Sequence, residues 1–176
     1  MNFDFFDAMT PEEAKEHLQG FLATESAAID QLAPAAQKAY VMLDYSLTSL
    51  TPFLRWLMTG VSVVRVPVPI SEPSWIREAH SEGLIDFEES SKYLVLRGGF
   101  YMGETFIRSF PSLRWATGNP QYIEKNMPVV TGFGDEVEMA PVMIVENLFT
   151  RILGQSGSVT DLDIAVRSWA RHAVPS

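Results

Sequence analysis

The sequence predicts an α+β fold with N-terminal helices, a small antiparallel sheet in the second half and C-terminal helices. Helical spacing of apolar residues organises most of the first hundred positions. Beyond them, short apolar runs alternate with turn signals such as Asn119-Pro120. From Pro141 onward the helical spacing returns. With 176 residues, one core is expected, so residues 1–176 are predicted to form a single domain.

The first long helix is predicted from a capping sequence. Thr10 suits the N-cap, Pro11 the first turn and Glu13 the third position of a capping box. We expect Pro34 to open a second helix that continues to residue 43. One side of the first helix carries the apolar residues Ala14, Leu18, Phe21 and Leu22.

Ser46 is expected to cap a third helix that ends at Gly60. Pro52 lies inside this pattern. It either kinks the helix or marks its true start, with Thr51 as the cap.

Residues 61–70 are rich in β-branched side chains, which favour a strand. Pro67 and Pro69 cannot donate to a sheet, so they limit this segment to an edge strand or an extended connector. Residues 71–82 are predicted to form a short helix.

A helix at the centre of residues 92–114 has two unlike faces. Gly98, Gly99 and Gly103 fall within six positions, although glycine in a helix interior costs roughly 1 kcal/mol relative to alanine. These glycines indicate that another backbone lies close to this face. The other face is a polar line at spacings of four, three and four, made of Arg97, Tyr101, Glu104 and Arg108.

Short strands are expected after this helix, followed by two more helices. The strands are predicted at residues 113–117, 122–123, 127–131 and 137–139, with a glycine-rich reversal at residues 132–136. Pro141 is expected to begin an amphipathic helix, and residues 154–157 to be a flexible break. Thr160 is the expected cap of the last helix.

Composition excludes several classes of protein and site. The chain has no cysteine, which excludes disulfides, thiolate metal sites and cysteine nucleophiles. The three histidines lie far apart without metal-ligand spacing, and the sequence has no Walker, Rossmann or G-x-S-x-G motif. We therefore predict no cofactor and no metal. The N-terminus does not resemble a signal peptide and no uninterrupted run of ~20 apolar residues occurs, so a cytoplasmic protein without a membrane partner is expected.

The net charge of −9 is concentrated at the start of the chain. Residues 1–50 hold eight acidic and two basic side chains. No cluster of Lys and Arg occurs anywhere, which argues against nucleic-acid binding. An acidic surface can steer the chain toward a basic partner, although solubility alone would also account for the charge.

Glu104 is the best candidate for a carboxylate with a shifted pKa. Burial would raise its pKa and the neighbouring arginines would lower it, so it could act as a general acid or base. The alternative is a structural i,i+4 pair with Arg108, and we favour it. Asp44 poses the same choice between chemistry and the bracing of the next helix. The candidate polar cluster is Arg97, Tyr101, Glu104, Arg108, Asp44 and Trp115.

The four tryptophans are more typical of a core or its rim than of a ligand site. Trp115 is bracketed by Pro111 and Pro120, so its strand should be short and near a sheet edge. A partly exposed ring is therefore expected there.

Several short motifs resemble those of a loose group of small, uncharacterised bacterial proteins. The group has an Asp-Tyr-Ser-x-x-Ser-Leu segment, a Tyr-x-Gly-Glu helix, a Trp-bearing strand and a helix that begins with proline. The resemblance covers residues 43–149 and implies the fold, with residues 1–42 as a helical extension outside it. Some members are suspected immunity proteins that neutralise secreted toxins. The shared positions are Asp44, Tyr45, Ser46, Leu50, Tyr101, Gly103, Glu104 and Trp115.

These observations favour a non-catalytic, immunity-like protein that neutralises a basic partner through an acidic surface. The expected contact regions are the first fifty residues and a hairpin that carries Asp135, Glu136 and Glu138. A first alternative is a small ligand-binding protein or enzyme with a pocket around Glu104. A second is a homo-oligomeric structural protein that docks through Phe3, Phe5 and Phe6.

Overall fold

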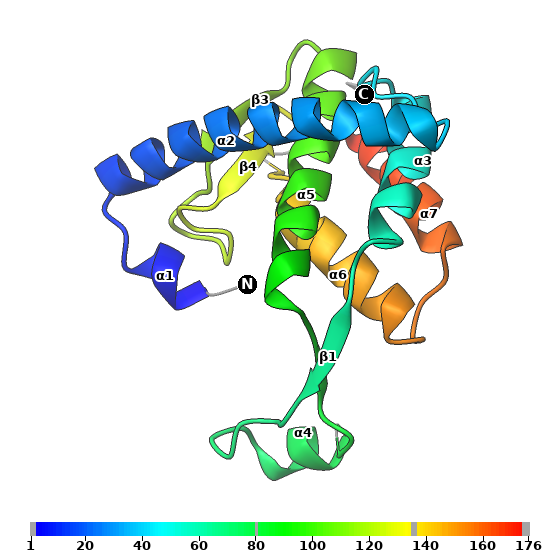
Figure 1. Cartoon of the computed structure of the whole chain (residues 1–176). Coiled ribbons are helices and arrows are strands. Elements are labelled where there is room, and N and C mark those ends of the chain that lie inside the picture. Colours follow the sequence, from blue (N-terminus) through cyan, green and yellow to red (C-terminus); the bar gives the residue numbers. More distant parts are fainter. Residues whose placement is uncertain (1–2, 80, 135–136, 174–176) are drawn as a thin grey trace.

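The long helix α5 (Glu89–Ser109) stands at the centre of the fold, as the computed structural model shows (Figure 1). The structure describes residues 3–79, 81–134 and 137–173. The other helices are α1 (Phe3–Asp7), α2 (Pro11–Lys38), α3 (Leu47–Met58), α4 (Ser74–Ala79), α6 (Pro141–Leu153) and α7 (Thr160–Ala173).

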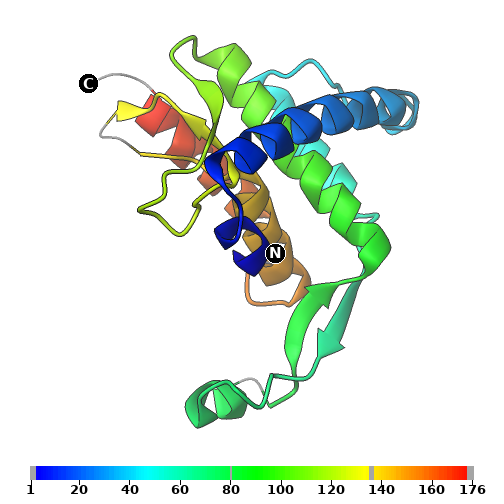
Figure 2. The same cartoon turned by 90° about the vertical axis from the view of Figure 1, so that its left-hand side faces the viewer.

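The core is built around α5, which packs against α6, α3 and α2, while α7 packs against α3. Figures 1 and 2 show α2 crossing over α5 on the side opposite α6. The buried core includes Phe53 and Leu54 from α3, Phe106 from α5 and Phe149 from α6. The sequence-predicted α+β class, with helices on both sides of the sheet region, is confirmed.

The glycines of α5 allow its neighbours to come close, as the sequence predicted. A Cβ atom at Gly99 would lie 2.5 Å from the Cα atom of Val142 in α6. A Cβ atom at Gly103 would overlap the Trp115 ring, and one at Gly98 would lie 2.9 Å from Val145. A real Cβ atom does not approach other atoms this closely, so these positions need glycine.

Each of the two described sheets consists of two antiparallel strands. Strand β3 (Arg114–Thr117) pairs with β4 (Pro128–Thr131), which confirms the small sheet expected in the second half. Strand β1 (Val63–Val66) is the predicted edge strand, and it pairs with β2 (Leu84–Phe87), which the sequence reading missed. Between them, the chain makes an excursion that contains α4.

Pro34 does not begin a second helix, because α2 runs through it to Lys38. A proline removes only one backbone hydrogen bond, and Pro34 is exposed, where water can satisfy the carbonyl left without a donor. Buried residues on both sides of it, Ile29 and Ala36, hold the helix against the core. The predicted continuation to residue 43 is also wrong, since Tyr40 has a left-handed backbone with φ 57°.

The alternative start of α3 with Thr51 as the cap is wrong as well. The Ser46 side chain accepts a hydrogen bond from the Ser49 N–H at 3.2 Å, so the predicted Ser46 cap is confirmed. Pro52 lies inside α3. Leu50 and Phe53, on either side of it in the same helix, are fully buried. Packing against the core therefore outweighs the hydrogen bond that Pro52 cannot make.

Two of the predicted strands do not form. Residues 122–123 lie in consecutive turns, because the loop after β3 closes on itself through hydrogen bonds such as Tyr122 N–H to the Asn119 carbonyl. Residues 137–139 contribute only an isolated bridge between Val130 and Met139. The chain turns into α6 directly after this bridge, and no room is left for a longer ladder.

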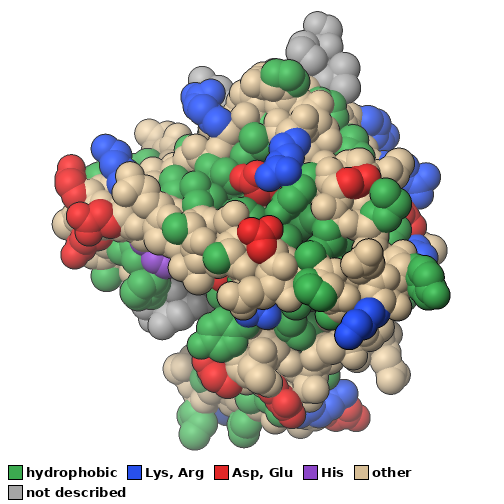
Figure 3. All heavy atoms as spheres, turned by 45° about the horizontal axis from the view of Figure 1, so that its top comes forward, with side chains coloured by type: hydrophobic (Ala, Val, Ile, Leu, Met, Phe, Trp, Pro, Cys, Tyr) green, Lys and Arg blue, Asp and Glu red, His purple; other side chains and the backbone are tan. Residues whose placement is uncertain are grey.

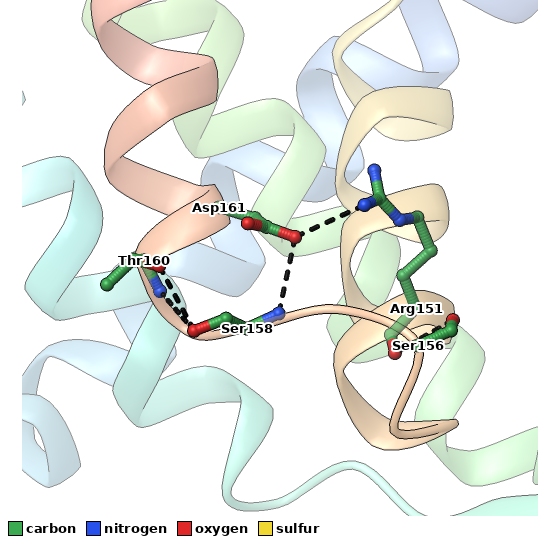
Figure 4. Close-up of polar contacts among 5 residues, drawn as sticks. All are labelled: Arg151, Ser156, Ser158, Thr160 and Asp161. Atoms are coloured by element: carbon green, nitrogen blue, oxygen red, sulfur yellow. Dashed lines mark hydrogen bonds and ion pairs between the residues drawn. The ribbon is translucent and has the colours of Figure 1, made fainter.

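The connection between α6 and α7, predicted to be a flexible break, is a hydrogen-bonded turn (Figure 4). Thr160 is not the cap of α7. The Ser158 side chain accepts a hydrogen bond from the Thr160 N–H at 3.4 Å, and the Ser158 N–H donates to Asp161 at 3.2 Å. These two bonds fix the turn before α7, and Arg151 adds an ion pair to Asp161 at 3.4 Å.

Candidate functional site

Tyr101 is the buried centre of the predicted polar cluster. Its side chain is fully buried in α5. Its hydroxyl lies 2.8 Å from the Ser49 hydroxyl and accepts a hydrogen bond from the Tyr45 N–H at 3.1 Å. These bonds tie α5 to the segment that leads into α3.

Tyr45 lies between this centre and the surface. Its backbone is left-handed, with φ 55°, and its ring stacks on Tyr101 with centroids 4.6 Å apart. The Arg108 guanidinium lies 3.7 Å from the centroid of the Tyr45 ring, within the range of a cation–π contact. Burial raises the pKa of both phenols, so each hydroxyl is protonated at neutral pH.

Glu104 is held by two partners, one on each carboxylate oxygen. The Trp115 indole N–H donates to its Oε1 atom at 2.8 Å, and the Arg108 Nε–H donates to its Oε2 atom at 3.3 Å. The predicted i,i+4 pair is therefore confirmed. Since both carboxylate oxygens are already hydrogen-bonded, this geometry suits a brace between α5 and β3 better than an acid or base.

Asp44 lies at the exposed end of the same cluster. Its Oδ1 atom accepts a hydrogen bond from the Ser46 N–H at 2.9 Å. Hydrogen bonds from Ser46 lower the pKa of Asp44, which is consistent with a carboxylate that braces the entry to α3.

Arg97 is separate from this network, although it lies on the same helix. It interacts electrostatically with Glu25 of α2. Glu25 is buried, and burial raises the pKa of its carboxyl group while Arg97 lowers it. The Glu25 Oε2 and Arg97 Nε atoms are buried without a hydrogen-bond partner among the described residues.

The sequence reading missed Glu25, yet its spacing contains a usable signal. Phe21, Glu25 and Ile29 are four positions apart, which places this acidic residue in the apolar stripe of α2. An acidic residue in such a stripe is expected to be buried. Such a residue predicts a basic partner on a helix that packs against the same side of α2.

The Trp115 ring is partly exposed, and β3 pairs only with β4 among the described strands, so the prediction of a short edge strand is confirmed. The ring packs edge-on against Phe21 at 5.7 Å and parallel to Phe100 at 6.3 Å. These contacts link α2, α5 and β3. The role of Trp115 in the structure is therefore to join three elements.

A separate hollow lies at the foot of the β1–β2 pair. This basal cavity has a volume of about 610 Å³. Its floor is apolar, and charged side chains of β2, α5 and α6 stand among its lining residues. The lining consists of Asp86, Phe87, Lys92, Val95, Leu96, Val142 and Glu146.

Residues 62–88, which we call the arm, project away from the helical body (Figures 1 and 2). The arm consists of β1, α4 and β2, and residue 80 lies outside its described part. Ile70 is 89% exposed and Trp75 is 68% exposed. The prediction that Trp75 belongs to the core or its rim is therefore wrong, because α4 lies at the tip, away from the body.

The predicted acidic contact residues differ in their exposure, and two of them lie outside the described residues. Glu12, Glu13 and Glu16 are exposed on the first turns of α2, where Figure 3 shows acidic side chains gathered at one end of the helix. Glu138 accepts a hydrogen bond from the Asn119 N–H at 2.9 Å and is partly buried. Asp135 and Glu136 lie outside the described residues.

The N-terminal phenylalanines contact the same chain. Phe6 is buried, and its ring lies 5.3 Å from that of His17, while Phe5 is half exposed. The Asn126 side chain donates to the Phe6 carbonyl at 2.9 Å and so fastens α1 to the loop after β3. The side chain of Phe3 lies outside the described part.

Among the described residues, no group of three or more metal-binding side chains is placed to hold a metal ion. None of the described helices has both the length and the apolar character needed to cross a membrane. Compared with family models, curated proteins and solved structures, the chain matches none.

Proposed function

We propose that this chain is a non-catalytic binding protein that neutralises a basic protein partner, in the manner of an immunity protein. The observation that carries the proposal is the acidic start of α2, where Glu12, Glu13 and Glu16 are exposed within five positions. Asp7 at the end of α1 adds a further exposed carboxylate, and Lys15 is the exposed base within this stretch. We call Asp7, Glu12, Glu13 and Glu16 the acidic end.

A second support is that the main polar groups of the cluster are already hydrogen-bonded within the chain. Both oxygens of Glu104 and the hydroxyl of Tyr101 are bonded to groups of the same chain. A general acid or base needs an atom within hydrogen-bond reach of its substrate. The geometry therefore favours binding through the surface over catalysis at Glu104.

Electrostatic steering makes the proposal testable. Charges at the rim of an interface act mainly on the association rate, and salt screens them over about 8 Å at physiological ionic strength. Association with a basic partner should therefore be slower when the charges of the acidic end are reversed. For the unaltered chain, association should become slower as the salt concentration rises.

The first step is to capture partners from a lysate of the source organism at low and high salt and to identify them by mass spectrometry. The association rate of the captured protein is then compared for the unaltered chain and for a Glu12→Lys/Glu16→Lys variant. Glu13 is left in place because it closes the capping box with Thr10.

A Glu78→Lys/Glu88→Lys variant is the matched control, because it changes the net charge equally at exposed positions of the arm. We expect the acidic-end variant to associate about tenfold more slowly at low salt, while the control changes much less. An association rate that responds to neither variant nor to salt contradicts the proposal.

A further inference from the structure

We infer that the groove between α3 and α7 binds a small organic anion that has an apolar body. The two helices pack side by side (Figure 1), and the groove between them, which we call the α3–α7 groove, has a volume of about 490 Å³. None of the described residues that line it belongs to the acidic end or to the polar cluster around Tyr101. This site is therefore separate from the surface proposed to bind a basic protein.

Both helices contribute apolar side chains to the α3–α7 groove. Leu47 and Pro52 come from α3, and Val166 and Ala170 come from α7. The volume of the groove lies within the roughly 300–1,000 Å³ of pockets that bury small organic molecules. Such pockets combine an apolar lining with a few placed polar groups, and the apolar part of this lining suits the body of the ligand.

The charged side chains of the groove favour an anion. Its described lining carries two cations, Arg55 and Arg167, and one anion, Asp163, although the whole chain has a net charge of −9. Asp163 is already paired, because Arg55 donates to its Oδ2 atom at 2.9 Å. The positive charge that remains is that of Arg167.

The Arg167 guanidinium has donors to spare. Its Nε–H donates to the backbone carbonyl of Asp163 at 3.2 Å, and its two terminal nitrogens have no partner among the described residues. A guanidinium carries five N–H donors, and its planar fork matches the two oxygens of a carboxylate or a phosphate. Arg167 is therefore placed to pair with the charged group of the ligand.

Thr51 is the second observation that points to a ligand. It lines the groove and is only 8% exposed, yet its hydroxyl forms no hydrogen bond with any described residue. A buried hydroxyl without a partner lowers stability, so most buried polar side chains have one. An anion in the groove would accept a hydrogen bond from Thr51 as well as from Arg167.

Fluorescence titration of the full chain with 8-anilinonaphthalene-1-sulfonate tests the inference, because this probe joins an apolar body to one anionic group. We expect it to bind, and Arg167→Met and Thr51→Val each to weaken its affinity at least about tenfold, since each removes a hydrogen bond to a charged group. Thr51→Val keeps the shape of the side chain and removes a hydroxyl without a partner, so it should not lower stability in chemical denaturation.

Two variants outside the groove are matched controls. Thr105→Val removes the hydroxyl of another buried threonine that has no partner among the described residues, and Thr105 lies in α5. Lys92→Met removes a cation from the basal cavity. Both should leave the affinity for the probe unchanged. In competition, octanoate should displace the probe, whereas 1-octanol and inorganic phosphate at the same concentration should not, because each of them has only one half of the required chemistry.

Several outcomes would overturn the inference. A probe that does not bind, or that binds Arg167→Met and Thr51→Val as tightly as the unaltered chain, has no site in the α3–α7 groove. A loss of affinity in Lys92→Met alone would place the probe in the basal cavity. Displacement by inorganic phosphate as effective as that by octanoate would mean an adventitious ion only. None of these variants changes the acidic end, so the inference and the proposed function fail independently.

Discussion

The helical body and the arm differ in what holds each of them together. In the body, α5 contacts α6 and β3 so closely that Gly99 and Gly103 leave no room for a methyl group. In the arm, two strands of four residues carry a short helix with an exposed tryptophan. Changes at the packed contacts of the body should therefore lower stability, while changes at the exposed tip of the arm should have little effect on it.

The largest effect is expected from Gly103→Ala. Its new methyl group would overlap the Trp115 ring, and this ring is fixed by Glu104, Phe21 and Phe100. We expect a loss of about 3 kcal/mol in the free energy of unfolding, measured by chemical denaturation.

Gly20→Ala is the matched control, because a Cβ atom at this α2 position meets nothing within 4 Å. It should raise stability by about 0.5–1 kcal/mol through helix propensity. Equal effects of the two substitutions would show that Trp115 can move aside. The contrast between body and arm would then be weaker than the geometry implies.

The next largest effect is expected from Tyr101→Phe. The substitution removes the hydroxyl that bonds the Tyr45 N–H and the Ser49 hydroxyl, which leaves the partly buried Tyr45 N–H and the buried Ser49 hydroxyl without this partner. We expect a loss of about 2 kcal/mol in the free energy of unfolding.

Tyr93→Phe serves as the comparison, since Tyr93 is 56% exposed on the same helix, and its effect should stay within about 0.5 kcal/mol. A loss of similar size at both positions would mean that the Tyr101 hydroxyl is not an essential link between α5 and α3.

A smaller effect is expected from Glu104→Gln. Glutamine keeps an oxygen for the Trp115 indole but loses the charge that holds Arg108. Because Arg108 is about half exposed, solvent weakens this pair, and we expect a loss of about 1 kcal/mol by thermal or chemical denaturation. An unchanged stability together with loss of a measurable activity would instead favour the alternative of a functional pocket around Glu104.

The sequence was most informative where one residue type determines local geometry. The N-caps at Thr10 and Ser46 and the Glu104–Arg108 spacing all act through neighbours within four positions. The predicted fold class followed from such local patterns. Pro34 was misinterpreted and Pro52 left two starts open, because the burial of neighbouring residues against the core decided both helices.

Contacts between distant segments were beyond the reach of the sequence. The hydrogen bond between Trp115 and Glu104 depends on how β3 returns to α5, and the pairing of β2 with β1 spans the excursion through α4. The exposure of Trp75 could not be predicted either, because tryptophan is usually buried and only the projection of the arm places it in solvent.

The smallest effect is expected from Glu25→Gln, as a change in how the free energy of unfolding depends on pH. Burial raises the pKa of Glu25 in the folded protein, so the folded state binds this proton more tightly than the unfolded state. As pH falls from neutral through the folded-state pKa, the unaltered chain should gain stability relative to the variant. The gain is complete below the pKa of an exposed glutamate, about 4.3.

Denaturation of both chains at several pH values measures this difference. Since Arg97 lowers the pKa of Glu25, Arg97→Met in both backgrounds should enlarge the pH-dependent difference. A difference that stays flat with pH would place the Glu25 carboxyl in contact with water. The junction between α2 and α5 would then resemble the solvated arm more than the dry contact at Gly99, and the boundary between the two regions would have to be redrawn.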